Sequence, residues 1–187
     1  LALVEGLGAA GVRAVGKHFP GHGYAHADSH HEVAVDEREL AEIKRRDLLP
    51  FARCAPVLGG IMPAHVVFPA IDPLPAGYSA RWLRGVLRSE LGFSGVIFSD
   101  DLSMAGAHAE GGICSRAAKA LSAGCDMVLV CNAPESADEL LAGFPNYQDQ
   151  SAAVRMHMHA RTIETSAPLA LADSRYVEHK RLLDGWA

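Results

Sequence analysis

Residues 95–104 read GVIFSDDLSM. Val96 to Phe98 form an unbroken run of β-branched and aromatic residues that follows a glycine and shows no polar alternation. Such a run is typical of a strand buried on both faces of a parallel sheet. The strand ends in two adjacent acids, Asp100 and Asp101, and burying an unpaired charge is costly. We therefore expect a buried strand that ends in a carboxylate with a functional role.

The same kind of run occurs four times along the chain. Runs bounded by glycine predict strands at 11–17, 60–65, 95–99 and 125–132. The amphipathic segments that follow them predict helices at 37–54, 80–90, 113–123 and 134–142. The expected helix boundaries are a capping box of Asp36 and Glu39, a cap at Ser79, a stop at Gly124, and Pro134 in a first turn.

Alternating strands and helices predict an α/β fold with a parallel sheet and right-handed crossovers. The last three strands recur about every 30 residues, as in a (β/α)8 TIM barrel, whose usual span is roughly 250 residues. Four units make about half of such a barrel, and a doubly wound open sheet is the alternative. Because the chain starts at Leu1 and runs directly into a helical pattern, we expect it to be the later part of a longer protein.

Two regions are expected on this basis. Residues 1–143 would be the C-terminal half of a TIM-barrel domain. Residues 144–187, with helical patterns at 147–165 and 173–186, would be a helical extension that packs on the barrel.

Composition limits the possible partners. The chain has 187 residues, is 49% apolar and 21% charged, and has a net charge of −5, which is typical of a soluble globular protein without a footprint for nucleic acid or for an anionic membrane. No apolar run approaches the roughly 20 residues of a membrane helix. Its four cysteines form no C-x-x-C pair, so free thiols in a reducing compartment, and hence a cytoplasmic location, are expected.

Polar residues gather where the predicted strands end. They are Lys17, His18, His65, Asp100, Asp101 and Asn132. The carboxyl ends of parallel strands share one edge of a sheet, where α/β proteins build their active sites. The pattern therefore favours an enzyme.

The loop after the first strand, KHFPGHGYAHADSHH at residues 17–31, is rich in histidine. Its histidines at 18, 22, 26 and 30 would share one face of a helix, as in a metal site, but Pro20, Gly21 and Gly23 exclude that helix. We expect His22, His26 and His31 to be surface or backbone-bonded side chains. Asp28 and His30 differ, because a carboxylate two residues before an imidazole in an extended loop can orient it as a general acid/base.

The two acids at the end of residues 95–101 are expected to have different roles. Side chains alternate in direction along a strand, so Asp100 shares the face of Val96 and Phe98. Asp101 is explained if it caps the following helix. Asp100 is then left for chemistry.

Five motifs together resemble the family 3 glycoside hydrolases, and more narrowly the bacterial cytoplasmic β-N-acetylhexosaminidases of cell-wall recycling. They are KHFPGHG (17–23), DSH (28–30), IMPAH (61–65), FSDDLSM (98–104) and AGCDM (123–127). The resemblance covers about residues 1–143. It implies a TIM barrel, a retaining mechanism, and removal of non-reducing N-acetylglucosamine from peptidoglycan fragments that carry anhydro-muramic acid.

The resemblance also implies a role for individual residues. Asp100 corresponds to the nucleophile, His30 to the acid/base, and Asp28 to the residue that orients His30. Lys17 and His18 correspond to residues that bind sugar hydroxyls, and we place His65 with them in the substrate-binding set. No cofactor or metal is implied, the partner is a small-molecule glycan, and the full-length parent is expected to be monomeric.

Two other functions stay open at this point. The family's earlier strands supply an Asp and an Arg that also hold the sugar, and nothing in this chain resembles that half, so a non-catalytic sugar-binding or regulatory fragment is one alternative. The other is a metal-dependent hydrolase with His18, His22, His65 and Asp100 as ligands. A metal assay and turnover of a chromogenic N-acetylglucosaminide would separate the three.

Overall fold

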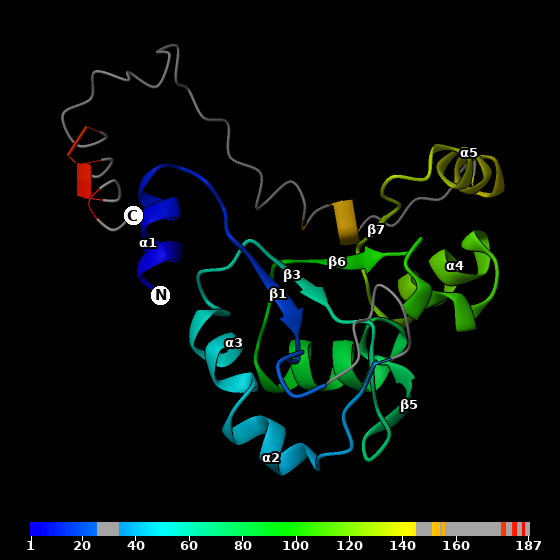
Figure 1. Ribbon diagram of the computed structural model, residues 1–187, viewed down its shortest axis with the longest axis horizontal. Helices are drawn as coiled ribbons and strands as arrows, with labels where there is room; N and C mark the ends of the chain where they lie inside the picture. The colour runs from blue at the N-terminus through cyan, green and yellow to red at the C-terminus, as the bar shows by residue number, and fades with distance from the viewer. Residues whose placement is uncertain are drawn as a thin grey trace.

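The computed structural model describes residues 1–25, 34–144, 151–153, 155, 177–178, 181–182 and 185. Its centre is a four-stranded sheet of β1 (Val15–Phe19), β3 (Gly60–Pro63), β6 (Val96–Asp101) and β7 (Met127–Leu129) (Figure 1). The strand order is β1-β3-β6-β7, and every neighbouring pair is parallel. The parallel α/β sheet predicted from the four apolar runs is confirmed, and within the described residues β1 and β7 are its two open edges.

Helices lie near both edges of this sheet. On the β1 side lie α1 (Ala2–Ala9), α2 (Leu40–Arg45) and α3 (Leu48–Cys54), and on the β7 side lie α4 (Ile113–Ala123) and α5 (Pro134–Gly143) (Figure 1). The wide π-helix η2 (Arg81–Glu90) connects β3 to β6, and two short 3₁₀ segments, η1 (Ala76–Tyr78) and η3 (Ala105–Glu110), complete the set. Among the described residues, no helix combines the length and the apolar character needed to cross a bilayer.

Two helix boundaries were predicted from their caps and are confirmed. The hydroxyl oxygen of Ser79 accepts a hydrogen bond from the backbone N–H of Trp82 at 3.2 Å, at the first turn of η2. Helix α4 ends at Gly124, whose φ of +127° is a conformation that side chains rarely adopt. At both boundaries the neighbouring residues alone were sufficient to predict where the helix begins or ends.

The predicted helix 37–54 is wrong as a single element. Arg46 leaves helical geometry, with φ −122° and ψ −75°, and divides the segment into α2 and α3. The expected capping box is also absent, because Asp36 is buried and accepts hydrogen bonds from Arg38, through its backbone N–H at 3.1 Å and its guanidinium at 2.7 Å. A second ion pair at 2.8 Å joins Arg38 to Asp47, at the start of α3.

A second, smaller sheet lies beside the first and was not predicted. It contains β2 (Ala34–Val35), β4 (Val66–Phe68) and β5 (Asp72–Pro75), in the order β2-β4-β5. The β2–β4 pair is parallel and the β4–β5 pair is antiparallel. The strands are only two to four residues long, too short to show a period in the sequence.

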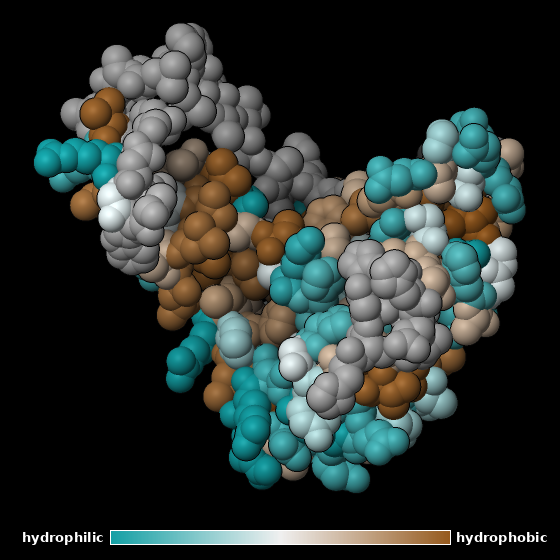
Figure 2. All heavy atoms as spheres, viewed as in Figure 1, coloured by the Kyte–Doolittle hydropathy of each residue, from teal (hydrophilic) through white to brown (hydrophobic). Residues whose placement is uncertain are grey.

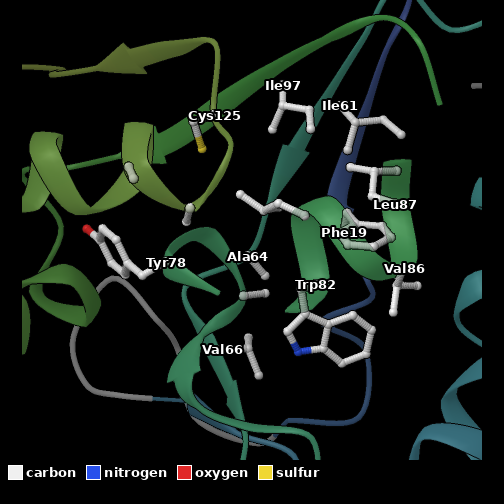
Figure 3. Close-up of a cluster of buried hydrophobic side chains, with 14 of the residues drawn as sticks. Phe19, Ile61, Ala64, Val66, Tyr78, Trp82, Val86, Leu87, Ile97 and Cys125 are labelled. Carbon is white, nitrogen blue, oxygen red and sulfur yellow. The ribbon is translucent and has the colours of Figure 1, made fainter. Parts of the chain in front are cut away.

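One part of the hydrophobic core lies between the main sheet and η2. Side chains from the strands, among them Phe19, Ile61 and Ile97, meet Trp82 and Leu87 of the helix (Figure 3). The Trp82 ring packs edge-on against two phenylalanine rings, with ring centroids 5.9 Å apart for Phe19 and 5.1 Å apart for Phe68. Helix η2 therefore fixes the sheet from which the site residues project.

A carboxylate secures the amino-terminal end of β6. Buried Asp126 accepts a hydrogen bond from the backbone N–H of Ile97 at 2.8 Å and from Arg88 at 2.7 Å. Its other oxygen accepts from Nε of Arg155 at 2.8 Å. A buried carboxylate is stable here because each oxygen has a charged partner.

Predictions for the C-terminal region fall mostly outside the described residues. Of the helices expected at 147–165 and 173–186, the structure describes 151–153, 155, 177–178 and 181–182, all helical. The division of the chain at residue 143 stays a prediction.

Candidate active site

The carboxyl ends of β1, β3 and β6 bring the predicted site residues to one edge of the sheet. Nε2 of His18 on β1 lies 3.7 Å from Oδ2 of Asp100 on β6. The His18 side chain is 34% exposed and that of Asp100 only 11%. An imidazole thus faces a carboxylate that is nearly withdrawn from water, and electrostatic interactions are strong in such surroundings.

Asp100 is held with one oxygen available. Its Oδ1 accepts a hydrogen bond from the backbone N–H of Asp101 at 2.8 Å, and its Oδ2 faces His18. A carboxylate fixed at the rim of a parallel sheet can attack an electrophilic carbon or stabilise a cationic transition state.

The predicted helix cap at Asp101 is wrong. No helix begins directly after it, since η3 starts at Ala105. Its Oδ1 instead accepts hydrogen bonds from the backbone N–H groups of Ser103 and Cys131, both at 2.9 Å. Asp101 therefore ties the turn after β6 to the segment that follows β7.

Lys17, His18 and His22 line one end of a groove of about 520 Å³ beside β1. The rest of its lining is largely apolar and comes mostly from α1, α3 and β1, with Leu7 on α1, Phe51 on α3 and Leu58 in the segment between α3 and β3. Figure 2 shows this apolar surface as a brown area around α1 and β1. The polar rim and the apolar groove thus meet at the Lys17–His18 pair.

His65 lies behind the rim rather than on it. It is 1% exposed, its Nε2 donates a hydrogen bond to the carbonyl oxygen of Asp101 at 3.0 Å, and its ring stacks on Tyr78 at 5.8 Å. Burial lowers the pKa of His65, although the charge of Asp100 acts in the opposite direction. Sequence reasoning missed Tyr78, because it comes from a three-residue 3₁₀ turn without a periodic pattern.

Cys131 follows β7 and lies close to the same turn. Partial burial, together with the charges of Asp101 and Asp100, raises the pKa of its thiol. A thiol is a weak nucleophile until it ionises, so Cys131 does not compete with Asp100.

Two predicted site residues, Asp28 and His30, lie outside the described residues, as do His26 and His31. The four ligands of the metal-hydrolase hypothesis, His18, His22, His65 and Asp100, are all described, and the structure does not assemble them. Over 1–25 and 34–144, no group of three His, Cys, Asp or Glu side chains is arranged to hold a metal ion.

Comparison with known proteins agrees with this geometry. The profile of the glycosyl hydrolase family 3 N terminal domain matches residues 1–160. The chain belongs to glycosyl hydrolase family 3.

Curated relatives of the chain include bacterial β-hexosaminidases. The chain is 60% identical over 141 residues to one from Pseudomonas aeruginosa, covering 75% of this chain and 42% of that protein. It is 50% identical over 182 residues to one from Bordetella avium, covering 97% of this chain and 52% of that protein. The chain thus spans about half the length, or less, of these curated relatives.

Solved family 3 structures share the fold. NagZ from Neisseria gonorrhoeae, in complex with N-trifluoroacetyl-D-glucosamine, matches with a TM-score of 0.84 and 41% identity, over 97% of this chain and 52% of that chain. A family 3 β-N-acetylglucosaminidase from Paenibacillus matches with a TM-score of 0.76 and 32% identity, over 94% of this chain and 37% of that chain.

Proposed function

We propose that this chain carries the catalytic centre of a retaining β-N-acetylglucosaminidase. Its substrates would be peptidoglycan fragments in which terminal, non-reducing N-acetylglucosamine is joined to anhydro-muramic acid, with or without peptide. The observation that carries the proposal is the approach of His18 to Asp100, 3.7 Å apart at the carboxyl edge of a parallel sheet. The β-hexosaminidase relatives and the NagZ structure support the same reaction class.

Asp100 would act as the nucleophile. Its carboxylate attacks the anomeric carbon while the bond to the leaving oxygen breaks, and a covalent glycosyl-enzyme results. Burial suits this role, because a carboxylate with few water contacts interacts strongly with an oxocarbenium-like transition state. The hydrogen bond from the Asp101 N–H keeps the carboxylate in one orientation.

His30 would supply and then remove the proton. As an imidazolium it protonates the leaving oxygen, and as a neutral imidazole it later takes a proton from the water that cleaves the glycosyl-enzyme. Asp28, two residues earlier, would orient the ring. General acid/base catalysis of this kind contributes about 10²–10⁴-fold in rate.

Lys17 and His18 would hold the sugar. Lys17 is exposed at the groove, and His18 is half-buried beside Asp100. An ammonium and an imidazole can both hydrogen-bond hydroxyl groups, so a sugar ring seated on Asp100 would lie within their reach.

The two open sheet edges, β1 and β7, suggest the complete architecture. In a (β/α)8 barrel each of these edges pairs with a further strand, so we infer that four more β/α units complete the barrel and bring additional sugar contacts. The whole protein is proposed to be a cytoplasmic monomer that needs no cofactor.

The test is turnover of para-nitrophenyl N-acetyl-β-glucosaminide. The 187-residue chain is assayed alone and in a chimera, in which it replaces the matching region of the Pseudomonas aeruginosa β-hexosaminidase. Hydrolysis by the chimera, with the β-anomer of N-acetylglucosamine as first product in an NMR time course, supports the proposal. A folded chimera without hydrolysis, or with the α-anomer as first product, overturns it.

A further inference from the structure

The two ring nitrogens of His65 have different surroundings, close to the proposed nucleophile. One ring nitrogen, Nε2, faces the carbonyl oxygen of Asp101 at 3.0 Å. The other, Nδ1, is buried and has no hydrogen-bond partner within the described residues. The ring itself is fixed by its stack on Tyr78.

This geometry defines the proton on the ring. A carbonyl oxygen only accepts, so Nε2 must carry the hydrogen. A hydrogen on Nδ1 would be a buried donor without an acceptor, which is costly. The geometry therefore specifies a neutral imidazole of the Nε2–H tautomer.

The acceptor of this hydrogen bond belongs to the residue that follows Asp100. The N–H of Asp101 donates to Oδ1 of Asp100 at 2.8 Å, and its side chain binds the N–H groups of Ser103 and Cys131. With His65 on its carbonyl oxygen, Asp101 is held through all of its polar groups. The Asp101 carbonyl oxygen also accepts a hydrogen bond from the backbone N–H of Met104 at 3.2 Å, so His65 is one of two donors that hold this residue beside Asp100.

We propose that His65 is a positioning residue for the nucleophile, acting through the Asp101 carbonyl oxygen rather than on the sugar. This inference rests on the proposed function of Asp100. It replaces the expectation that His65 binds substrate, since a ring that is 1% exposed, with Nε2 used and one face covered by Tyr78, offers nothing to a sugar hydroxyl.

A matched pair of amides tests the proposal. In His65→Gln the side-chain nitrogen can occupy the place of Nε2 and donate to Asp101, whereas in His65→Asn it reaches only the place of Nδ1. Both variants are measured in the chimera. We expect His65→Gln to keep most of the wild-type kcat and His65→Asn to lose about 10²-fold, because a displacement of about 1 Å can cost that much, with KM almost unchanged in both.

The opposite kinetic pattern would overturn the inference. A rise in KM with unchanged kcat in both variants would mean that His65 contacts the sugar, and equal losses in Gln and Asn variants of equal melting temperature would mean that the donor at Nε2 is irrelevant. Absence of turnover in the wild-type chimera would count against the proposed function only.

A spectroscopic readout is independent of activity and of whether the variants fold. Long-range ¹H–¹⁵N spectra of the wild-type chimera at neutral pH should show His65 with a protonated Nε2 and an unprotonated Nδ1. A neutral ring protonated on Nδ1 instead would refute the contact on which the inference depends, and a ring protonated on both nitrogens would refute the neutral tautomer that the geometry specifies.

Discussion

The imidazole of His18 and the carboxylate of Asp100 meet over a strand that carries neither of them. Both β1 and β6 pair with β3, so the ends of β1 and β6 are about 10 Å apart. The side chains nevertheless extend toward each other and approach to 3.7 Å. The space beside this pair is where an anomeric carbon would have to lie for Asp100 to attack it.

Asp100→Asn is expected to abolish formation of the glycosyl-enzyme while leaving the fold nearly unchanged. The amide keeps an oxygen for the Asp101 N–H but is no nucleophile, so a whole chemical step is lost. In the wild-type chimera, a 5-fluoro glycosyl donor followed by peptide mass mapping should label Asp100. A label on Asp101 or Asp28 would contradict the assignment.

Asp101→Asn is the matched control for that substitution. Its carboxylate accepts hydrogen bonds from the turn at Ser103 and from Cys131, and an amide group cannot satisfy all of them. We expect a loss of about 1–3 kcal/mol in the free energy of unfolding, measured with urea. If Asp100→Asn proves the more destabilising of the two, the roles of these neighbouring acids have been exchanged.

His30→Ala should slow the hydrolysis of substrates with poor leaving groups much more than the hydrolysis of activated aryl glycosides. Aryl leaving groups need little protonation, whereas a disaccharide loses the full contribution of the general acid, about 10²–10⁴-fold. Asp28→Asn should give a similar pattern, because the ring loses the carboxylate that orients it. The measurement is kcat/KM on both substrate types, with azide added to restore deglycosylation in His30→Ala.

The same measurements on the His30 and Asp28 variants can instead identify Asp28 as the residue that protonates the leaving group. Near wild-type rates of His30→Ala on a disaccharide, together with a large loss in Asp28→Ala, would make Asp28 the direct acid. The usual pair of carboxylates in glycosidases would then apply.

The free energy of unfolding should decrease as the pH is lowered below about 6.5, because His65 becomes protonated. Burial lowers the pKa of this histidine from 6.5 in the folded state, against the opposing charges of Asp100 and Asp101 and with the charge of Arg116. The unfolded chain then binds more protons, so the contribution of the neutral ring is complete above the unfolded pKa and is lost as the pH falls toward the folded one. Urea unfolding of wild type and His65→Gln between pH 7.5 and 5 should give a steeper decline for wild type. Parallel declines would show that His65 titrates normally.

Activity of the chimera should withstand chelators. The proposed steps use only a carboxylate and an imidazole, and neither needs a Lewis acid. Hydrolysis is compared before and after dialysis against EDTA. A loss that zinc or another divalent ion restores would revive the metal-hydrolase alternative.

Local chemistry explains which parts of the fold could be predicted. Helix η2 (Arg81–Glu90) and helix α4 (Ile113–Ala123) match the predictions because Ser79 and Gly124 define an end within a few residues of sequence. The parallel sheet was predictable because its strands lie within short apolar runs, although only β3 and β6 are mostly buried.

Contacts that are distant in sequence explain the rest. Arg38 draws together Asp36 and Asp47, and this ion-pair cluster accompanies the division of one amphipathic pattern into two helices. Asp101 looked like a helix cap because its partner Cys131 lies 30 positions away. His65 was predicted at the end of a strand, but it follows β3 by two residues, and nothing local indicates that its ring is buried and stacks on Tyr78.

The two ends of β6 are secured by different acids. Asp126 holds Ile97 at the amino end, and Asp101 holds the turn at the carboxyl end. Ile97 and Asp101 are four positions apart along the strand, or roughly 13 Å, and effects at such separations usually add. Substitutions around Asp101 and substitutions around Asp126, Arg88 and Arg155 should therefore change the free energy of unfolding independently, and a gain at one end of β6 need not be lost at the other.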